Sequence, residues 1–179
     1  MKITTSEASV GDAFLAQSQD FLKHDYLPKL ERCLASLTDE QIWWRPGSES
    51  NSIGNLLLHL AGNARQWIIS GLGGEVDKRT RSQEFEESAL ISGADLIARL
   101  RQTIDEVDDV LSAFDARRLL DHFQIQGTDV TALEAIFHVT EHFSMHTGQI
   151  IFITKMLSHS NLDFYSFSNG VPIHTWRDE

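Results

Sequence analysis

The sequence TALEAIFHVTEHFSMHTGQIIFITKML, residues 131–157, decides the fold. It opens with Thr131 and Glu134 at the spacing of a capping box, in which the Glu134 side chain reaches back to the Thr131 backbone N–H. Apolar residues then cover much of the circumference of a helix, which is typical of a helix buried in a bundle. The pattern therefore predicts a long buried helix that runs to about Leu157.

Three further segments have helical spacing, with apolar residues three, four or seven positions apart. They cover about residues 10–37, residues 51 or 52 to 71, and residues 94–114. Pro28 lies inside the first segment and is expected to kink it. Since the strand signals are few and short, the chain is predicted to be an all-α four-helix bundle that forms a single domain, residues 1–179.

The connections between these segments differ in length. Residues 38–46, TDEQIWWRP, predict a short helical turn that is capped by Thr38 and stopped by Pro46. A polar connection of about twenty residues follows the Gly73-Gly74 pair, and it is too long for an ordinary link between neighbouring helices. The aromatic C-terminal segment, residues 164–176, is expected to pack on the bundle, with a cover over a pocket mouth as the alternative.

Composition excludes several classes of partner. The formal net charge is -11, with 15 Lys and Arg against 26 Asp and Glu, so a nucleic-acid partner would be repelled. The apolar run 149–157 is interrupted by Thr154 and Lys155 and cannot span a membrane. Cys33 is the one cysteine, and it lies on an apolar stripe, so we expect a core residue rather than a catalytic thiol. The lack of disulfides, and of a signal-peptide pattern in residues 1–14, predicts a cytoplasmic protein.

Three histidines of the quoted segment, His138, His142 and His146, follow one another at intervals of four residues. Residues four apart lie above one another on a helix, with Cβ atoms about 6 Å apart. The outer two are about 12 Å apart along the axis, so all three cannot easily converge on one ion. One adjacent pair is therefore predicted to bind a metal ion, together with a ligand from another helix of the bundle.

The natural third ligand is His59, because it shares a predicted inward face with Leu56, Leu60 and Trp67. A buried imidazole needs a partner, and the alternative to a metal ion is an ordinary hydrogen bond within the core. The pattern is not that of a zincin, which requires glutamate directly after the first histidine of the pair. Glu141 precedes His142 and points about 100° away around the helix, so we do not assign it as a general base.

These segments resemble the DinB-like family of metalloenzymes, also called the DinB/YfiT superfamily. The similar stretches are SIGNLLLHL at residues 52–60 and HVTEHFSMHTGQI at residues 138–150. WWRP at residues 43–46 and Glu84-Phe85 in the long connection are also similar. The second stretch is fairly specific, whereas the others are weak alone.

The resemblance implies a four-helix bundle in up-down-down-up order, in which the long connection lets the second and third helices run parallel. It implies a metal triad of His59, His142 and His146, with His138 left to line the pocket or support a ligand. It also implies zinc or nickel as the metal, and a homodimer. Characterised relatives include transferases and isomerases that use low-molecular-weight thiols, and many members have no known activity.

Three functions follow as hypotheses. The first is a metal-dependent transferase that adds a low-molecular-weight thiol to a small electrophilic substrate, because a cation beside three neutral imidazoles would lower the pKa of a thiol or water. The second is a metal-dependent hydrolase. The third is a non-catalytic metal-binding or stress-response module. Asn63 and Gln149 share faces with His59 and His146 and could orient a ligand, although bonds to each other are an equal alternative. No catalytic residue or organic cofactor site is assigned.

Overall fold

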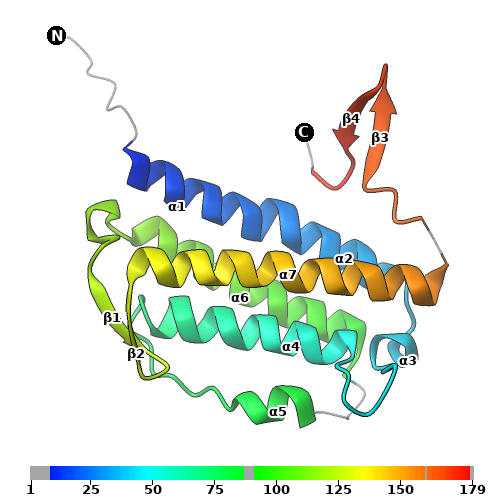
Figure 1. Cartoon of the computed structure of the whole chain (residues 1–179), viewed down its shortest axis with the longest axis horizontal. Helices are drawn as coiled ribbons and strands as arrows, with labels where there is room; N and C mark the ends of the chain where they lie inside the picture. The colour runs from blue at the N-terminus through cyan, green and yellow to red at the C-terminus, as the bar shows by residue number, and fades with distance from the viewer. Residues whose placement is uncertain (1–8, 87–90, 160, 178–179) are drawn as a thin grey trace.

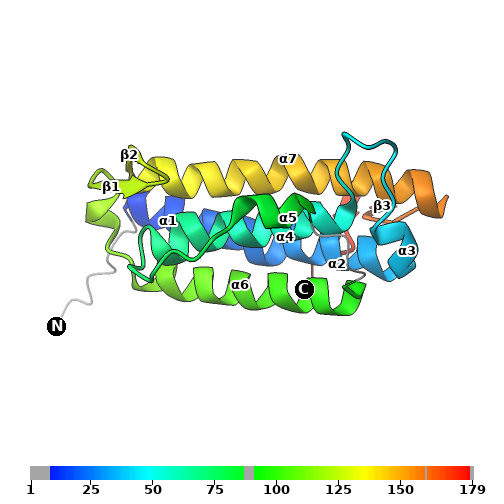
Figure 2. The same cartoon turned by 90° about the horizontal axis from the view of Figure 1, so that it is seen from below.

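The computed structural model describes residues 9–86, 91–159 and 161–177, and most of them are helical. Four long helical segments lie side by side along the long axis of the molecule (Figures 1 and 2). Their bounds are α1 Val10–Asp20 continued by η1 Phe21–Tyr26 and α2 Leu27–Ala35; α4 Ile53–Ala64 continued by η2 Arg65–Ser70; α6 Gly93–Ala113; and α7 Ala132–Ser158. Each of the four segments lies within about three residues of the range predicted from apolar spacing.

The helices begin where their sequences supply a cap. The Thr131 side chain accepts a bond from the Glu134 backbone N–H, while Glu134 Oε2 accepts one from the Thr131 N–H at 2.7 Å, so the predicted capping box is present. Ser52 forms the same arrangement with Asn55 at the start of α4. These bonds satisfy N–H groups that the first helical turn leaves without partners, and they define where α4 and α7 begin.

The first segment is not a regular α-helix. The π-helical segment η1 ends at Tyr26, two residues before Pro28, which lies in the first turn of α2 and at which the sequence predicts a kink. Pro28 has no backbone N–H to donate, so the regular ladder of hydrogen bonds is interrupted at this point. A second π-helical segment, η2, extends α4.

The core lies between the four segments and is built from the apolar stripes predicted from the sequence. Leu22, Leu30 and Cys33 are buried, which confirms the expectation that Cys33 is a core residue. Burial raises the pKa of the Cys33 thiol to about 11, so it is protonated at neutral pH. The largest fully buried side chains come from every long segment: Phe143, Leu22, Leu30, Ile53, Leu57, Leu60, Ile68, Leu100 and Ile104.

Shorter elements connect and cover the bundle. Helix α3, Asp39–Ile42, forms the predicted turn but ends at Ile42, well before Pro46. Helix α5, Arg81–Glu86, lies in the long connection and packs on α4 (Figure 2). The 3-10 turn η3, Ala116–Arg118, follows α6.

The described residues include two β-hairpins that the apolar spacing does not predict. Strand β1, His122–Ile125, pairs with β2, Thr128–Thr131, and strand β3, Tyr165–Ser168, pairs with β4, Val171–His174. Both hairpins are antiparallel and turn through two residues of positive φ, Gln126-Gly127 and Asn169-Gly170. The Asn-Gly pair in particular favours such a turn, so all-α describes the core but not the whole chain.

The C-terminal segment packs on the bundle, as expected. Trp176 is buried and its Nε1 donates to Asp25 Oδ1 at 2.8 Å. Arg32 donates from Nη2 to the Thr175 carbonyl at 2.6 Å. The hairpin is therefore anchored at its base on η1 and α2, whereas its strands are exposed.

Within the described residues, no helix has the length and apolar character needed to cross a bilayer. Residues 1–8, on which part of the signal-peptide interpretation rests, lie outside the described residues.

Candidate metal centre

Helices α4 and α7 bring three of the predicted histidines together. His59 Nε2 lies 3.1 Å from His142 Nε2, and His146 Nε2 lies 3.1 Å from the same atom. The three candidate ligand atoms all lie within 4.8 Å of one another. His59 and His142 are buried, whereas His146 is half-buried. Together these side chains could hold one metal ion.

His138 is not part of this cluster. Its Nε2 lies 3.1 Å from Asn63 Nδ2, and its ring packs against Trp67 with ring centres 4.2 Å apart. The ring of His138 stacks on that of His142, with centres 5.4 Å apart. His142 and His146 are therefore the adjacent pair whose ring nitrogens meet His59, and the Nε2 atom of His138 lies at Asn63 instead.

Hydrogen bonds at the far side of two rings leave their Nε2 atoms without protons. His59 Nδ1 lies 2.9 Å from Glu84 Oε2 and 3.1 Å from Arg79 Nη2. The carboxylate is the nearer of the two and can only accept, so we assign a proton on Nδ1 to this bond. His146 Nδ1 lies 2.7 Å from the accepting Gln149 Oε1, which has the same effect. Both Nε2 lone pairs consequently point at His142.

His142 completes a set of donors that suits a cation. Its Nδ1 has no hydrogen-bond partner among the described residues, and its Nε2 faces the lone pairs of the other two rings. One N–H on His142 Nε2 cannot serve both neighbours equally, whereas one cation can bind all three nitrogens. Zinc–nitrogen bonds of about 2.0–2.1 Å in tetrahedral geometry separate two nitrogens by about 3.3 Å, close to the 3.1 Å here. The residues therefore fit a metal ion.

Comparison with known proteins places the chain in a family. Residues 9–171 match the family described as "Protein of unknown function (DUF1572)". The chain belongs to the DUF1572 family. Comparison with curated proteins found no match.

Solved structures similar to this DUF1572 chain share its fold. A DinB-like protein from Bacillus cereus is 17% identical, with a TM-score of 0.62 over 79% of this chain and 89% of that one. A conserved protein from Enterococcus faecalis is 15% identical, with a TM-score of 0.64 over 89% of this chain and 99% of that one. The resemblance to DinB-like proteins is thus confirmed for the fold.

The DUF1572 chain also holds His59 through residues that sequence reasoning missed. Arg79 donates to Glu84 from Nε at 2.7 Å and from Nη2 at 2.9 Å. Burial alone would raise the pKa of Glu84, but hydrogen bonds from Arg79 and His59 outweigh it and hold this pKa below its ordinary value. Glu84 is therefore ionised at neutral pH and keeps the proton of His59 on Nδ1. The only signal for it in the sequence was its place in the similar Glu84-Phe85 pair.

Gly62 leaves space for the Glu84 side chain that contacts His59. Glu84 comes from α5 and crosses α4 beside Gly62, where an added Cβ would collide with Glu84 Oε1 and lie 2.9 Å from its Cδ. The Phe85 ring also packs against the His59 imidazole, with ring centres 4.9 Å apart. Helix α5 thus positions His59 from outside the bundle, through one hydrogen bond and one ring contact.

Burial keeps the imidazoles of His138, His142 and His146 neutral. Burial, followed by the neighbouring histidines and Arg79, lowers the pKa of His142 from 6.5 to about 3. Burial also lowers the pKa values of His146 and His138. Neutral imidazole is the form that binds a metal ion.

Proposed function

We propose that this DUF1572 chain is a divalent-metal-dependent enzyme whose ligands are His59, His142 and His146. The observation that carries the proposal is the convergence of three ring nitrogens, two of which are deprotonated by oxygen acceptors on the far side of the ring. Imidazole ligands favour zinc or nickel over magnesium and calcium, which prefer oxygen.

The chain's own residues supply orientation and charge. Glu84 holds the Nδ1 proton of His59, and Gln149 holds that of His146. Three protein ligands leave a coordination position for a small molecule, as in catalytic rather than structural sites. A divalent cation bound there would lower the pKa of a thiol or water at neutral pH. The reaction we propose is transfer of a low-molecular-weight thiol to a small electrophile.

The experiment is a thiol-consumption screen with protein of known metal content. Several cellular thiols are paired with electrophiles, and the His142→Ala variant serves as the matched control. We expect consumption by metal-loaded wild type alone. Ester or amide turnover without thiol would replace the transferase with a hydrolase. Metal binding without any turnover would replace both with a non-catalytic binding module.

We also infer the architecture and setting in which this site works. The packing of α4 against both α6 and α7, with α5 in the long connection, supports the up-down-down-up bundle as a single domain over residues 1–179. The formal net charge of -11 supports a partner other than nucleic acid. The buried lone Cys33 supports a reducing, cytoplasmic location.

A homodimer is part of the proposal. Apolar side chains lie exposed on one side of α7, at positions that recur with helical spacing. Phe137 is 60% and Phe152 66% exposed, and Gly148 between them has open space around its Cβ position. In Figure 2, α7 forms one edge of the bundle with no long helix beyond it. Such a face is typical of a surface that a second copy covers.

A further inference from the structure

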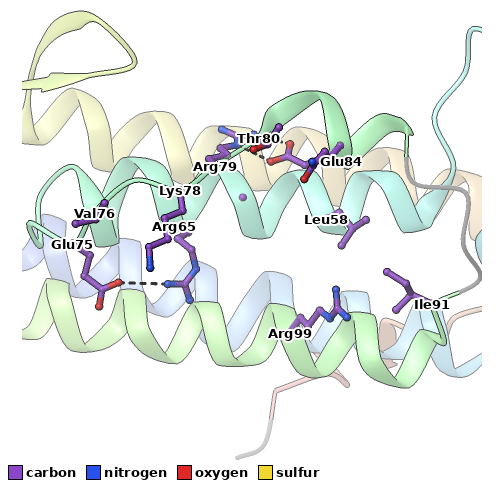
Figure 3. A pocket seen from close by; sticks show the side chains of 12 residues that line it. Leu58, Arg65, Glu75, Val76, Lys78, Arg79, Thr80, Glu84, Ile91 and Arg99 are labelled. Atoms are coloured by element: carbon purple, nitrogen blue, oxygen red, sulfur yellow. Dashed lines mark hydrogen bonds and ion pairs between the residues drawn. The ribbon is translucent and has the colours of Figure 1, made fainter.

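A cavity of about 540 Å³ lies outside the histidine cluster, between α4, the connection after η2, α5 and the first turns of α6. Figure 3 shows the side chains that line it, with Arg99 rising from α6 and Lys78 descending from the connection. Its size is within the usual range of small-molecule sites. None of the three clustered histidines lines it.

The lining is cationic although the chain is strongly acidic. Among the described residues, four basic side chains line the cavity against two carboxylates: Arg65, Lys78, Arg79 and Arg99 against Glu75 and Glu84. Both carboxylates are already paired, because Glu75 lies 3.7 Å from Arg65 and Glu84 binds Arg79. Arg65 also pairs with Glu106. Two positive charges therefore remain for a ligand.

Those two charges belong to Lys78 and Arg99. Within the part of the chain that the structure describes, neither side chain makes a hydrogen bond or an ion pair, and both are exposed. They reach the cavity from opposite sides in Figure 3. An ammonium and a guanidinium placed in this way suit a carboxylate or a phosphate, which accepts several charge-assisted hydrogen bonds.

The remaining walls define the rest of the ligand. Leu58 from α4, Val76 from the connection and Ile91 before α6 give the cavity apolar surface. Thr80 and Gln83 add a hydroxyl and an amide. From this lining we propose that the cavity binds a small organic anion, with its carboxylate or phosphate between Lys78 and Arg99 and its apolar part against Leu58 and Ile91. This inference goes beyond the proposed function and does not depend on it.

The test is a titration of the full chain with small probes, monitored through the chemical shifts of its backbone amides by NMR. The probes are phenyl phosphate and phenylacetate, which share a ring and differ in the anionic group, with phenol as the neutral control. We expect saturable shifts at Gly62 and Thr80, which line the cavity, and none at Gly170 in the β3–β4 hairpin, which does not line it. The tighter of the two anions identifies the group that the cavity prefers, and phenol should be the weakest of the three.

The variant Lys78→Ala/Arg99→Ala removes both free charges and should weaken binding of the better anion by about tenfold or more. Lys155→Ala is the matched control, since it removes an exposed cation from α7 and should leave binding unchanged. Metal content is measured on the same samples, so a failure of the metal proposal is seen separately. The inference is overturned if neither anion shifts Gly62 and Thr80, or if the double variant binds as tightly as wild type.

Discussion

His142 lies between His59 and His146, each of which directs a lone pair at it. Replacing it with Ala leaves two ligands on different helices, so bound metal should fall from about one ion per chain to near none. His138→Ala is the matched control, because His138 Nε2 contacts the Asn63 side chain and not the three clustered nitrogens. Elemental analysis of both purified variants is the measurement. Full metal in His142→Ala with loss in His138→Ala would show that the assigned triad of His59, His142 and His146 is wrong.

The same buried ring makes the metal-free protein sensitive to acid. The pKa of His142 is about 3 in the folded chain against 6.5 ordinarily, so the unfolded chain takes up a proton that the folded chain refuses. The free energy of unfolding should be unaffected above pH 6.5 and should fall as pH drops from there towards 3, by about 1.4 kcal/mol per pH unit for this group. Urea unfolding after chelation, at several pH values, measures the slope. His142→Gln should have a shallower slope, and an equal slope in both proteins would contradict the assignment.

At the residue scale, the sequence indicated the histidines that could bind the metal ion, but not the residues that hold His59 in place. The four-residue spacing of the histidines on α7, and the inward face of His59 on α4, follow from helical periodicity alone. Choosing His142 and His146 over His138 and His142 needed the family resemblance. Glu84 and Arg79 could not be found by periodicity, because they reach His59 through the folding of an irregular connection onto α4.

At the scale of the elements, the contact between α5 and α4 should be sensitive to a single methyl group on α4. Gly62→Ala places a Cβ where the Glu84 carboxyl lies, so Glu84 must leave His59 Nδ1. Supporting residues of this kind change metal affinity by about 10–100-fold, and we expect a loss within that range although no ligand is altered. Competition with a chelator of known affinity measures it. Gly148→Ala on α7 is the control, because its Cβ position is open; equal affinity in both variants would mean that Glu84 adapts without cost.

The long helices could be predicted because each repeats an apolar stripe over several turns, as Leu100, Ile104, Val107 and Leu111 do on α6. The hairpins could not, because each strand has four residues and its pairing depends on one two-residue turn. Asn169-Gly170 was the available signal for β3 and β4. The apolar spacing did not predict the π-helical segments either, and Pro28 was the one sequence feature that indicated an irregularity near η1.

For the whole molecule, the exposed face of α7 predicts self-association. Phe137→Glu/Phe152→Glu places two charges on that face, so it should convert a dimer at micromolar concentration into a monomer, as measured by light scattering. Ala98→Glu on α6 adds charge at another exposed helical position and should leave the dimer intact. A wild-type monomer at these concentrations would contradict the homodimer.

Glu84 and Arg79 border both the histidine cluster and the cationic cavity. Two ligands that share one wall can change each other's affinity. Thermodynamics requires the factor by which the metal changes the affinity for the anion to equal the factor by which the anion changes the affinity for the metal. A dication on one side and an anion on the other attract, so each should tighten the other's binding. Phenyl phosphate should therefore bind metal-loaded protein more tightly than chelator-treated protein. Glu84 and Arg79 would then couple the two sites, and the concentration of a small anion would set the affinity of the chain for its metal ion.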